Sequence, residues 1–210
     1  MRTFRRYLTA FCMLCLLPCF AFASDISFSG GYTKVDMQQG NRRVILSGGA
    51  KVSTDKVELV SETIELYGDN YRYVTCTGSV SATEAENGIS FTSPNIQYDR
   101  ELGIVRSDSW IEIQDTKNQV ALSGAWFEYD MEKSLMRLQM MAKIIKVTDQ
   151  GLMVCRADSI EYDGEANTVS LKGNASVSWN NDTYKAAMIV VDLNTNAISL
   201  YGTITGEFNG

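Results

Sequence analysis

A chain of 210 residues with a formal net charge of −6 suits one domain with a sizeable core, or two small ones. It contains no His, which excludes Ser-His-Asp and Cys-His catalysis and every zinc site that needs an imidazole ligand. Only two Pro accompany sixteen Gly and many Val, Ile, Thr and Tyr residues, a composition typical of strands joined by glycine-bearing turns. We therefore expect a β-rich protein.

The first 23 residues have the pattern of an export signal. Three Arg among the first six residues precede an apolar run over 7–20, and Ala21 and Ala23 supply the small residues that a signal peptidase requires. This run is short of the roughly 20 residues that span a bilayer. We therefore predict cleavage after Ala23, which leaves one domain over 24–210. A retained membrane anchor and a lipoprotein attached through Cys19 are the alternatives.

The part of the chain after the signal is decidedly acidic. The signal takes away three Arg and no acidic residue, which leaves a net charge of −9 over 24–210. This charge, without any basic cluster, disfavours nucleic acid and anionic membrane surfaces as partners. Of the five Cys, only Cys76 and Cys155 follow the signal, and their wide separation along a stack of strands predicts two buried free thiols.

An internal repeat organises this part of the chain. A small residue is followed three positions later by an apolar residue, then by a second apolar residue and, in four copies, by an Asp that precedes a turn. The leading apolar residues are separated by 32, 31, 33 and 29 residues. Regular spacing of strands in any antiparallel protein is the alternative explanation. The small residues are Ser61, Ser93, Gly124, Ala157 and Ala186, and the apolar ones are Ile64, Ile96, Phe127, Ile160 and Ile189.

Each period alternates between apolar and polar residues, and a helical period does not fit. Val169, Leu171 and Val177, for example, would share one face of a strand. Between Ala157 and Ile160 the apolar positions change from odd to even, which requires a bulge or a corner. We therefore predict an all-β fold of antiparallel strands that bend, so that the sheet folds over itself.

The fourth copy also carries a resemblance to a known family. Its phrase over 157–163, the turn through Asn167 and the strand over 169–177, together with the export signal, resemble the LptA/OstA family of periplasmic lipopolysaccharide-transport proteins, or organic solvent tolerance protein-like domains. The similarity covers about residues 30–205 and implies a single open β-jellyroll of stacked, V-shaped strands in the periplasm. Met140 and Met141 stand where a Gly-Asn pair is expected.

The resemblance implies that the acyl chains of lipid A, or of a related acylated glycolipid, enter the jellyroll. Because each buried methylene is worth about 0.8 kcal/mol, such a lipid needs an apolar shelter to cross an aqueous gap. The alternative is that the inward side chains only fill a core. The residues predicted to line the lipid site are Ile64, Leu66, Ile96, Tyr98, Phe127, Tyr129, Ile160, Tyr162, Leu171, Val177, Ile189 and Val191.

The family also implies docking at the two ends of the stack of strands. Strands near 28–35 and 198–208 would leave unpaired backbone groups that extend into the sheet of another jellyroll. The implied partners are an inner-membrane LptC-like component, an outer-membrane LptD-like component and further copies of this chain arranged head to tail. The sequence has no nucleotide-binding motif, so energy for transport would come from another protein.

We expect no catalysis, no metal and no cofactor. Four Asp could stack into a cation site or a catalytic pair, but Asp directly after a strand more often accepts hydrogen bonds from a turn backbone. Three Trp could form a sugar platform, but isolated Trp in strands more often pack on a sheet face. These residues are Asp99, Asp130, Asp163 and Asp192, and Trp110, Trp126 and Trp179.

Three other functions fit parts of the pattern. A structural or adhesive β-repeat protein of the cell envelope would have a dry, closed interior. A small outer-membrane β-barrel would need apolar residues facing outwards, whereas Glu161, Lys172 and Ser176 occupy outward positions here. A β-solenoid enzyme that acts on polysaccharide would need paired Asp residues.

Overall fold

The computed structural model describes residues 26–38 and 41–207, and most of these lie in strands. The expected export signal over 1–23 lies outside the described residues. Within them, the one helical segment is the 3-10 turn η1 (Asp69–Tyr71). No helix in this part of the chain is long and apolar enough to cross a membrane. The expectation of an all-β fold is confirmed.

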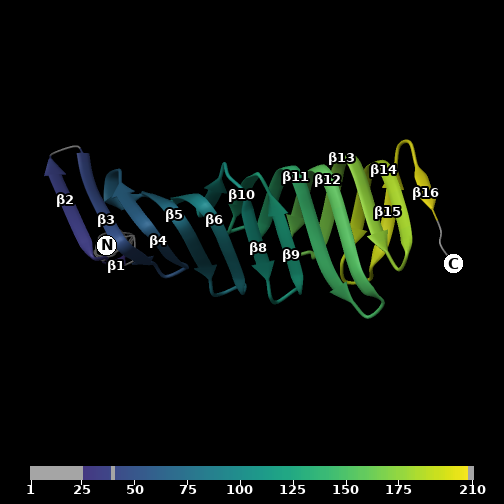
Figure 1. Cartoon of the computed structure of the whole chain (residues 1–210), viewed down its shortest axis with the longest axis horizontal. Helices are drawn as coiled ribbons and strands as arrows, with labels where there is room; N and C mark the ends of the chain where they lie inside the picture. The colour runs from purple at the N-terminus through teal and green to yellow at the C-terminus, as the bar shows by residue number, and fades with distance from the viewer. Residues whose placement is uncertain (1–25, 39–40, 208–210) are drawn as a thin grey trace, which may run out of the picture.

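The strands lie side by side along the long axis of the molecule, from β2 at one end to β16 at the other (Figure 1). In the long ones buried and exposed residues alternate, because one face of each strand packs into the core. The strands are β1 (Ser27–Ser29), β2 (Tyr32–Gln38), β3 (Asn41–Ser53), β4 (Val57–Tyr67), β5 (Tyr73–Glu84), β6 (Ile89–Asp99), β7 (Ile104–Ser107), β8 (Ile111–Asp115), β9 (Val120–Gly124), β10 (Trp126–Asp130), β11 (Leu135–Thr148), β12 (Gly151–Asp163), β13 (Thr168–Trp179), β14 (Asp182–Asp192), β15 (Ala197–Tyr201) and β16 (Thr205–Glu207).

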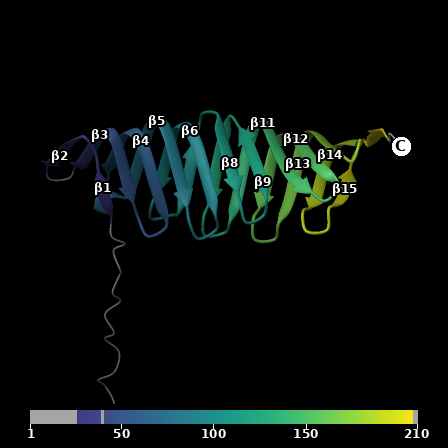
Figure 2. The same cartoon turned by 60° about the horizontal axis from the view of Figure 1, so that its bottom comes forward.

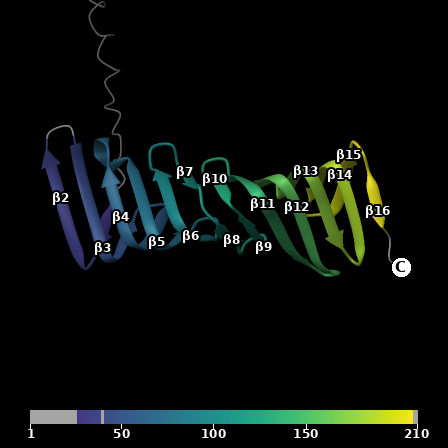
Figure 3. The ribbon, with the colours of Figure 1, turned by 45° about the horizontal axis from the view of Figure 1, so that its top comes forward.

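Each long strand contributes to two layers of antiparallel sheet. In β12 and β13, for example, Arg156 pairs with Ser176 on one side of a bulge and Ser159 pairs with Lys172 on the other. The short strands belong to one layer each. The first layer contains β2, β7, β10 and β15, and the second layer contains β1, β8, β9 and β16. Figure 2 turns β8 and β9 towards the viewer, and Figure 3 turns β7 and β10.

The crease is the line of register shifts at which the long strands pass from one layer to the other. It runs through β3, β4 and β5 and continues through β11, β12 and β13. Four strands make the bend with two consecutive residues at positive φ, which Gly adopts freely and Asn adopts more readily than most residues. These pairs are Gly48-Gly49, Gly78-Ser79, Met140-Met141 and Gly173-Asn174.

The small residues of the repeat lie on the inner side of the crease. Ala157 pairs directly with Ala142, and both are buried. A Cβ atom on Gly124 would lie only 3.3 Å from the carbonyl oxygen of Gln139. The repeat therefore has a steric cause: close packing inside the bend leaves space for small side chains alone.

The third repeat differs from the predicted bent strand. β7 ends at Ser107 and β8 begins at Ile111, so two separate strands take the place of one. At this break the Ser107 Oγ accepts a hydrogen bond from the Ser109 amide at 3.2 Å and lies 2.9 Å from the Ser93 Oγ. These side chains satisfy polar groups that the interrupted ladder of backbone hydrogen bonds leaves available.

The two cysteines of the described residues are buried free thiols, as predicted. Cys76 pairs with Ile96 in the first layer, and Cys155 pairs with Val177 in the second. Burial raises the pKa of both thiols to about 12. Each thiol is therefore neutral at physiological pH and out of reach of reagents in solution.

We expect both thiols to resist modification in the folded protein. In a chain with Cys12, Cys15 and Cys19 changed to Ser, a thiol-exchange reagent such as DTNB at pH 8 should label neither remaining Cys, because thiolate and access are both lacking. In urea both should react, which provides the control. Rapid labelling without urea would contradict the closed core at these positions.

Candidate functional site

All twelve residues predicted to line the interior lie in one continuous core. Their exposed fractions range from 0 to 4%. Aromatic rings pack against one another in its middle: the Phe91 ring centroid lies 5.5 Å from that of Phe127 and 5.8 Å from that of Tyr129. Side chains thus fill the space between the layers at these residues. Whether a lipid occupies this interior stays a prediction.

The apolar core is left uncovered at both ends of the stack. Phe28 pairs with Val52 and Val35 pairs with Val44, so both face the interior. They are nevertheless 48% and 51% exposed. At the other end, Ile198 of β15 packs against the core and is only partly buried. The interior therefore meets solvent at each end.

Strand edges are also free at these two ends. β1 and β2 pair with β3 alone, and β15 and β16 pair with β14 alone, within the residues that the structure describes. These strands occupy most of the ranges 28–35 and 198–208 that the sequence singled out as edges. Their outer backbone groups could hydrogen-bond to a strand of another chain.

The open edge is the side of the molecule where the turns of the two layers meet without a strand passing between them. There the Tyr162 hydroxyl donates a hydrogen bond of 2.7 Å to the Asp115 carboxylate, 47 residues earlier. The Asn118 side-chain amide donates at 2.9 Å to both residues and lies 3.3 Å from the Gly164 carbonyl oxygen. We call Asp115, Asn118 and Tyr162 the seam cluster.

Burial strengthens the seam cluster. Asp115 is 3% exposed and Tyr162 is fully buried. Burial raises the pKa of the Tyr162 hydroxyl, and the neighbouring Asp115 raises it further, so the hydroxyl keeps its proton and donates. A hydrogen bond from a neutral donor to a buried carboxylate is among the stronger kinds in proteins. The cluster therefore ties β8 of the second layer to β12 of the first.

Neighbouring repeats place polar groups at the same edge. Glu84 is buried at the end of β5 and accepts a hydrogen bond of 3.2 Å from the Asn87 amide. Its other carboxylate oxygen has no hydrogen-bond partner among the described residues. One repeat further along, the Lys146 ammonium donates at 2.5 Å to the carbonyl oxygen of Leu193. The buried polar groups of the seam cluster are thus all hydrogen-bonded, whereas Glu84 beside them has a carboxylate oxygen without a partner among the described residues.

A cleft of about 370 Å³ lies along the open edge at the seam cluster. The second layer lines it with Lys117 and Asn118, among others, and the first layer lines it with Glu132, Gly164 and Glu165. Its walls therefore come from both layers and carry both signs of charge.

Sequence reasoning did not single out Asp115, Asn118 or Glu84. One signal was present: Ile111, Ile113 and Asp115 continue a single alternation, which places an acid in the inward register. Glu84 ends the alternation of Val80 and Ala82 in the same way. An inward acid needs a polar partner, but the sequence does not show which residue supplies it.

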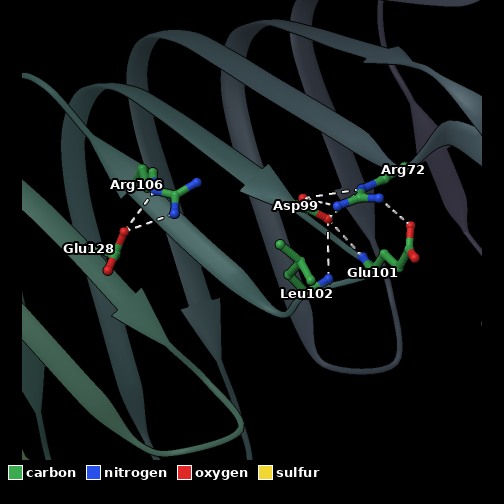
Figure 4. Close-up of polar contacts among 6 residues, drawn as sticks. All are labelled: Arg72, Asp99, Glu101, Leu102, Arg106 and Glu128. Atoms are coloured by element: carbon green, nitrogen blue, oxygen red, sulfur yellow. Dashed lines mark hydrogen bonds and ion pairs between the residues drawn. The ribbon is translucent and has the colours of Figure 1, made fainter.

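The four Asp after strands serve turns. The Asp99 Oδ1 accepts hydrogen bonds from the amides of Glu101 at 3.1 Å and Leu102 at 3.2 Å, and Arg72 pairs with the same carboxylate at 2.7 Å (Figure 4). The hydrogen bond from Arg72 is the main cause that lowers the pKa of Asp99. Asp130, Asp163 and Asp192 also accept turn amides. In the described residues no three acidic or Cys side chains are placed to hold a metal ion.

The three Trp do not form a platform. Trp179 packs partly buried against the core and donates a hydrogen bond of 3.0 Å to the Thr148 hydroxyl. Trp110 is 42% exposed in the connection between β7 and β8. None of the aromatic ring pairs found among the described residues joins two Trp.

Comparison with known proteins places these features in one family. A family model described as "LptA/(LptD N-terminal domain) LPS transport protein" matches residues 33–197. One similar solved structure is that of LptH from Pseudomonas aeruginosa, described as the LptA homologous periplasmic component of the lipopolysaccharide transport device. It has 14% sequence identity and a TM-score of 0.30, over 89% of this chain and 96% of that chain. No curated protein gives a significant match.

Proposed function

The chain belongs to the LptA/LptD N-terminal domain family of lipopolysaccharide-transport proteins, and we propose that it is a periplasmic bridge component that shields the acyl chains of lipid A. The family is one of transport bridges rather than enzymes. Export by a signal over 1–23, cleaved after Ala23, would place the chain in the periplasm.

One observation carries the proposal: the apolar core runs the length of the stack and is uncovered at both ends. Exposure of an acyl chain of about twelve carbons to water costs on the order of 10 kcal/mol, because each methylene contributes about 0.8 kcal/mol. A continuous apolar interior that opens to admit the acyl chain would remove this barrier. Passage from one unit to the next then requires similar affinity at each, since tight binding at one would stop the lipid there.

The free strand edges support docking at the two ends. An edge at β2 and another at β15 could each extend into the sheet of a further jellyroll, which would join the two apolar interiors. The partners proposed are an LptC-like inner-membrane component, an LptD-like outer-membrane component and other copies of this chain head to tail.

A second candidate is a structural or adhesive β-repeat protein of the cell envelope. The observation that favours it is the filled interior, in which the twelve predicted lining residues are almost inaccessible to water. The two candidates differ in whether acyl chains ever contact these residues.

Photocrosslinking from the interior distinguishes them. A small aliphatic diazirine residue in place of Ile160, which is buried on β12, should crosslink to lipid A added in detergent. The matched control is the same residue in place of Glu161, which is next in the chain and faces outwards beside Arg137. We expect at least a tenfold greater yield of lipid adduct at position 160, measured by mass spectrometry.

Equal yields at the two positions, or adducts at position 161 alone, would show that lipid contacts only the outer surface. Thermal unfolding of both variants checks that each remains folded. If both variants are folded and lipid contacts only the outer surface, the transport proposal would give way to the structural one.

A further inference from the structure

A carrier with a filled interior must open to admit a ligand, and the fold offers two sides at which to do so. At the crease every long strand continues from one layer to the other, so separation there would break the paired backbone of β3–β6 and β11–β13. At the open edge the layers are held by side chains and turns. Opening by rotation about the crease therefore breaks the fewest backbone hydrogen bonds.

From this geometry we propose that an acylated glycolipid enters sideways through the cleft at the open edge, and that the seam cluster is the latch that must release before it does. The proposal rests on the function proposed above. It assigns Asp115, Asn118 and the Tyr162 hydroxyl to the control of access, while the Tyr162 ring remains part of the predicted lining.

The contacts of the seam cluster fit a latch. Asp115 comes from β8 and Tyr162 from β12, so their hydrogen bond must break when the layers part. Asp115 still accepts hydrogen bonds of 2.9 Å from the Asn118 amide and side chain, which belong to its own hairpin. The carboxylate thus keeps partners on its own side in an open form, which reduces the cost of release.

The adjoining groups show why release would occur here. Beside the latch, one carboxylate oxygen of the buried Glu84 has no hydrogen-bond partner among the described residues, so this part of the edge contributes less to closure. The cleft walls carry Lys117 on one layer and Glu165 on the other. Hydrogen-bonding groups at a mouth above an apolar interior suit a ligand with a polar sugar head and acyl tails.

A reversible bridge across the cleft tests the proposal. In the chain with Cys12, Cys15 and Cys19 changed to Ser, Lys117→Cys and Glu165→Cys would be joined by a short bifunctional methanethiosulfonate, which reductant removes. The latch residues are unchanged in this variant, and Cys76 and Cys155 are buried and should not react. We expect the bridge to slow uptake of fluorescently labelled lipid A at least tenfold and reductant to restore it.

The matched control is a bridge within one layer, between Glu86→Cys and Lys117→Cys. Both positions line the same cleft from neighbouring hairpins of the second layer, so this bridge adds the same chemical group without joining the layers. It should leave uptake within twofold of the unbridged form. Unchanged uptake with the cross-layer bridge would overturn sideways access but leave the carrier function intact, since lipid would then enter at the ends. Failure of every form, including the unaltered protein, to bind lipid A would overturn the carrier function and the latch together.

A loosened latch should have the opposite effect. Tyr162→Phe keeps the aromatic ring and removes only the hydroxyl that bonds to Asp115. We expect lipid A uptake to become about tenfold faster, the factor that corresponds to one hydrogen bond to a charged acceptor. Tyr201→Phe, an exposed position on β15, is the control and should not change the rate. Unfolding in urea monitors stability, and a folded Tyr162→Phe variant with an unchanged or slower rate would contradict the latch.

Discussion

Replacement of Phe127 by Ala should lower the free energy of unfolding by about 3–5 kcal/mol. Phe127 is fully buried on β10, where its ring lies against Phe91 in the middle of the core. Loss of the ring removes buried apolar area and leaves a cavity that a sheet paired on both sides fills poorly. The measurement is unfolding in urea followed by far-ultraviolet circular dichroism.

The matched control is Phe28→Ala. Phe28 also faces inwards, but it lies on β1 at the end of the stack and is 48% exposed, so its loss should cost less than about 1 kcal/mol. Similar losses for the two variants would show that the middle of the core is as loosely packed as its end. That result would contradict the filled interior on which the need for a latch depends.

At the crease of β11 we expect a substitution to stabilise the protein rather than to destabilise it. The double variant Met140→Gly with Met141→Asn should raise the free energy of unfolding by about 1–2 kcal/mol. Both Met have positive φ, 58° and 62°, a conformation that strains most side chains and suits Gly and Asn. Their side chains are 57% and 77% exposed, so little packing is lost with them.

A variant with Ala at both positions separates strain from the loss of exposed apolar surface. Ala removes most of each side chain but keeps the Cβ atom that clashes at positive φ, so it should give no gain in stability. The same urea titration compares the three proteins. A gain with Ala equal to that with Gly and Asn would contradict strain as the cause.

Strand positions and the crease could be predicted from residues close together in the sequence. Alternation with a period of two decides which side chains face inwards, and it placed Ile160 and Tyr162 correctly in the core. The small residues at Ala157 and its equivalents marked the bend, because a bend leaves space for little else. Met140 and Met141 replace the Gly-Asn pair that marks the bend in β13, yet the neighbouring strands impose the same bend here.

The break in the third repeat could not be predicted in this way. Gly124 carries the same small-residue signal as its equivalents, but the chain there separates into β9 and β10. Whether a bend becomes a bulge or an interruption depends on hydrogen bonds to other strands, such as those from the Ala125 amide to the carbonyl oxygens of Gln139 and Met140 on β11.

The sequence by itself thus determined an all-β stack, the inward face of each strand and the line along which the strands bend, because these follow from side-chain direction and size over a few residues. Only the tertiary structure decided that the interior is filled and that Asp115 meets Tyr162 at the open edge. The physical reason is that residues 47 positions apart come together through the tilt and twist of two stacked layers, which no local pattern encodes.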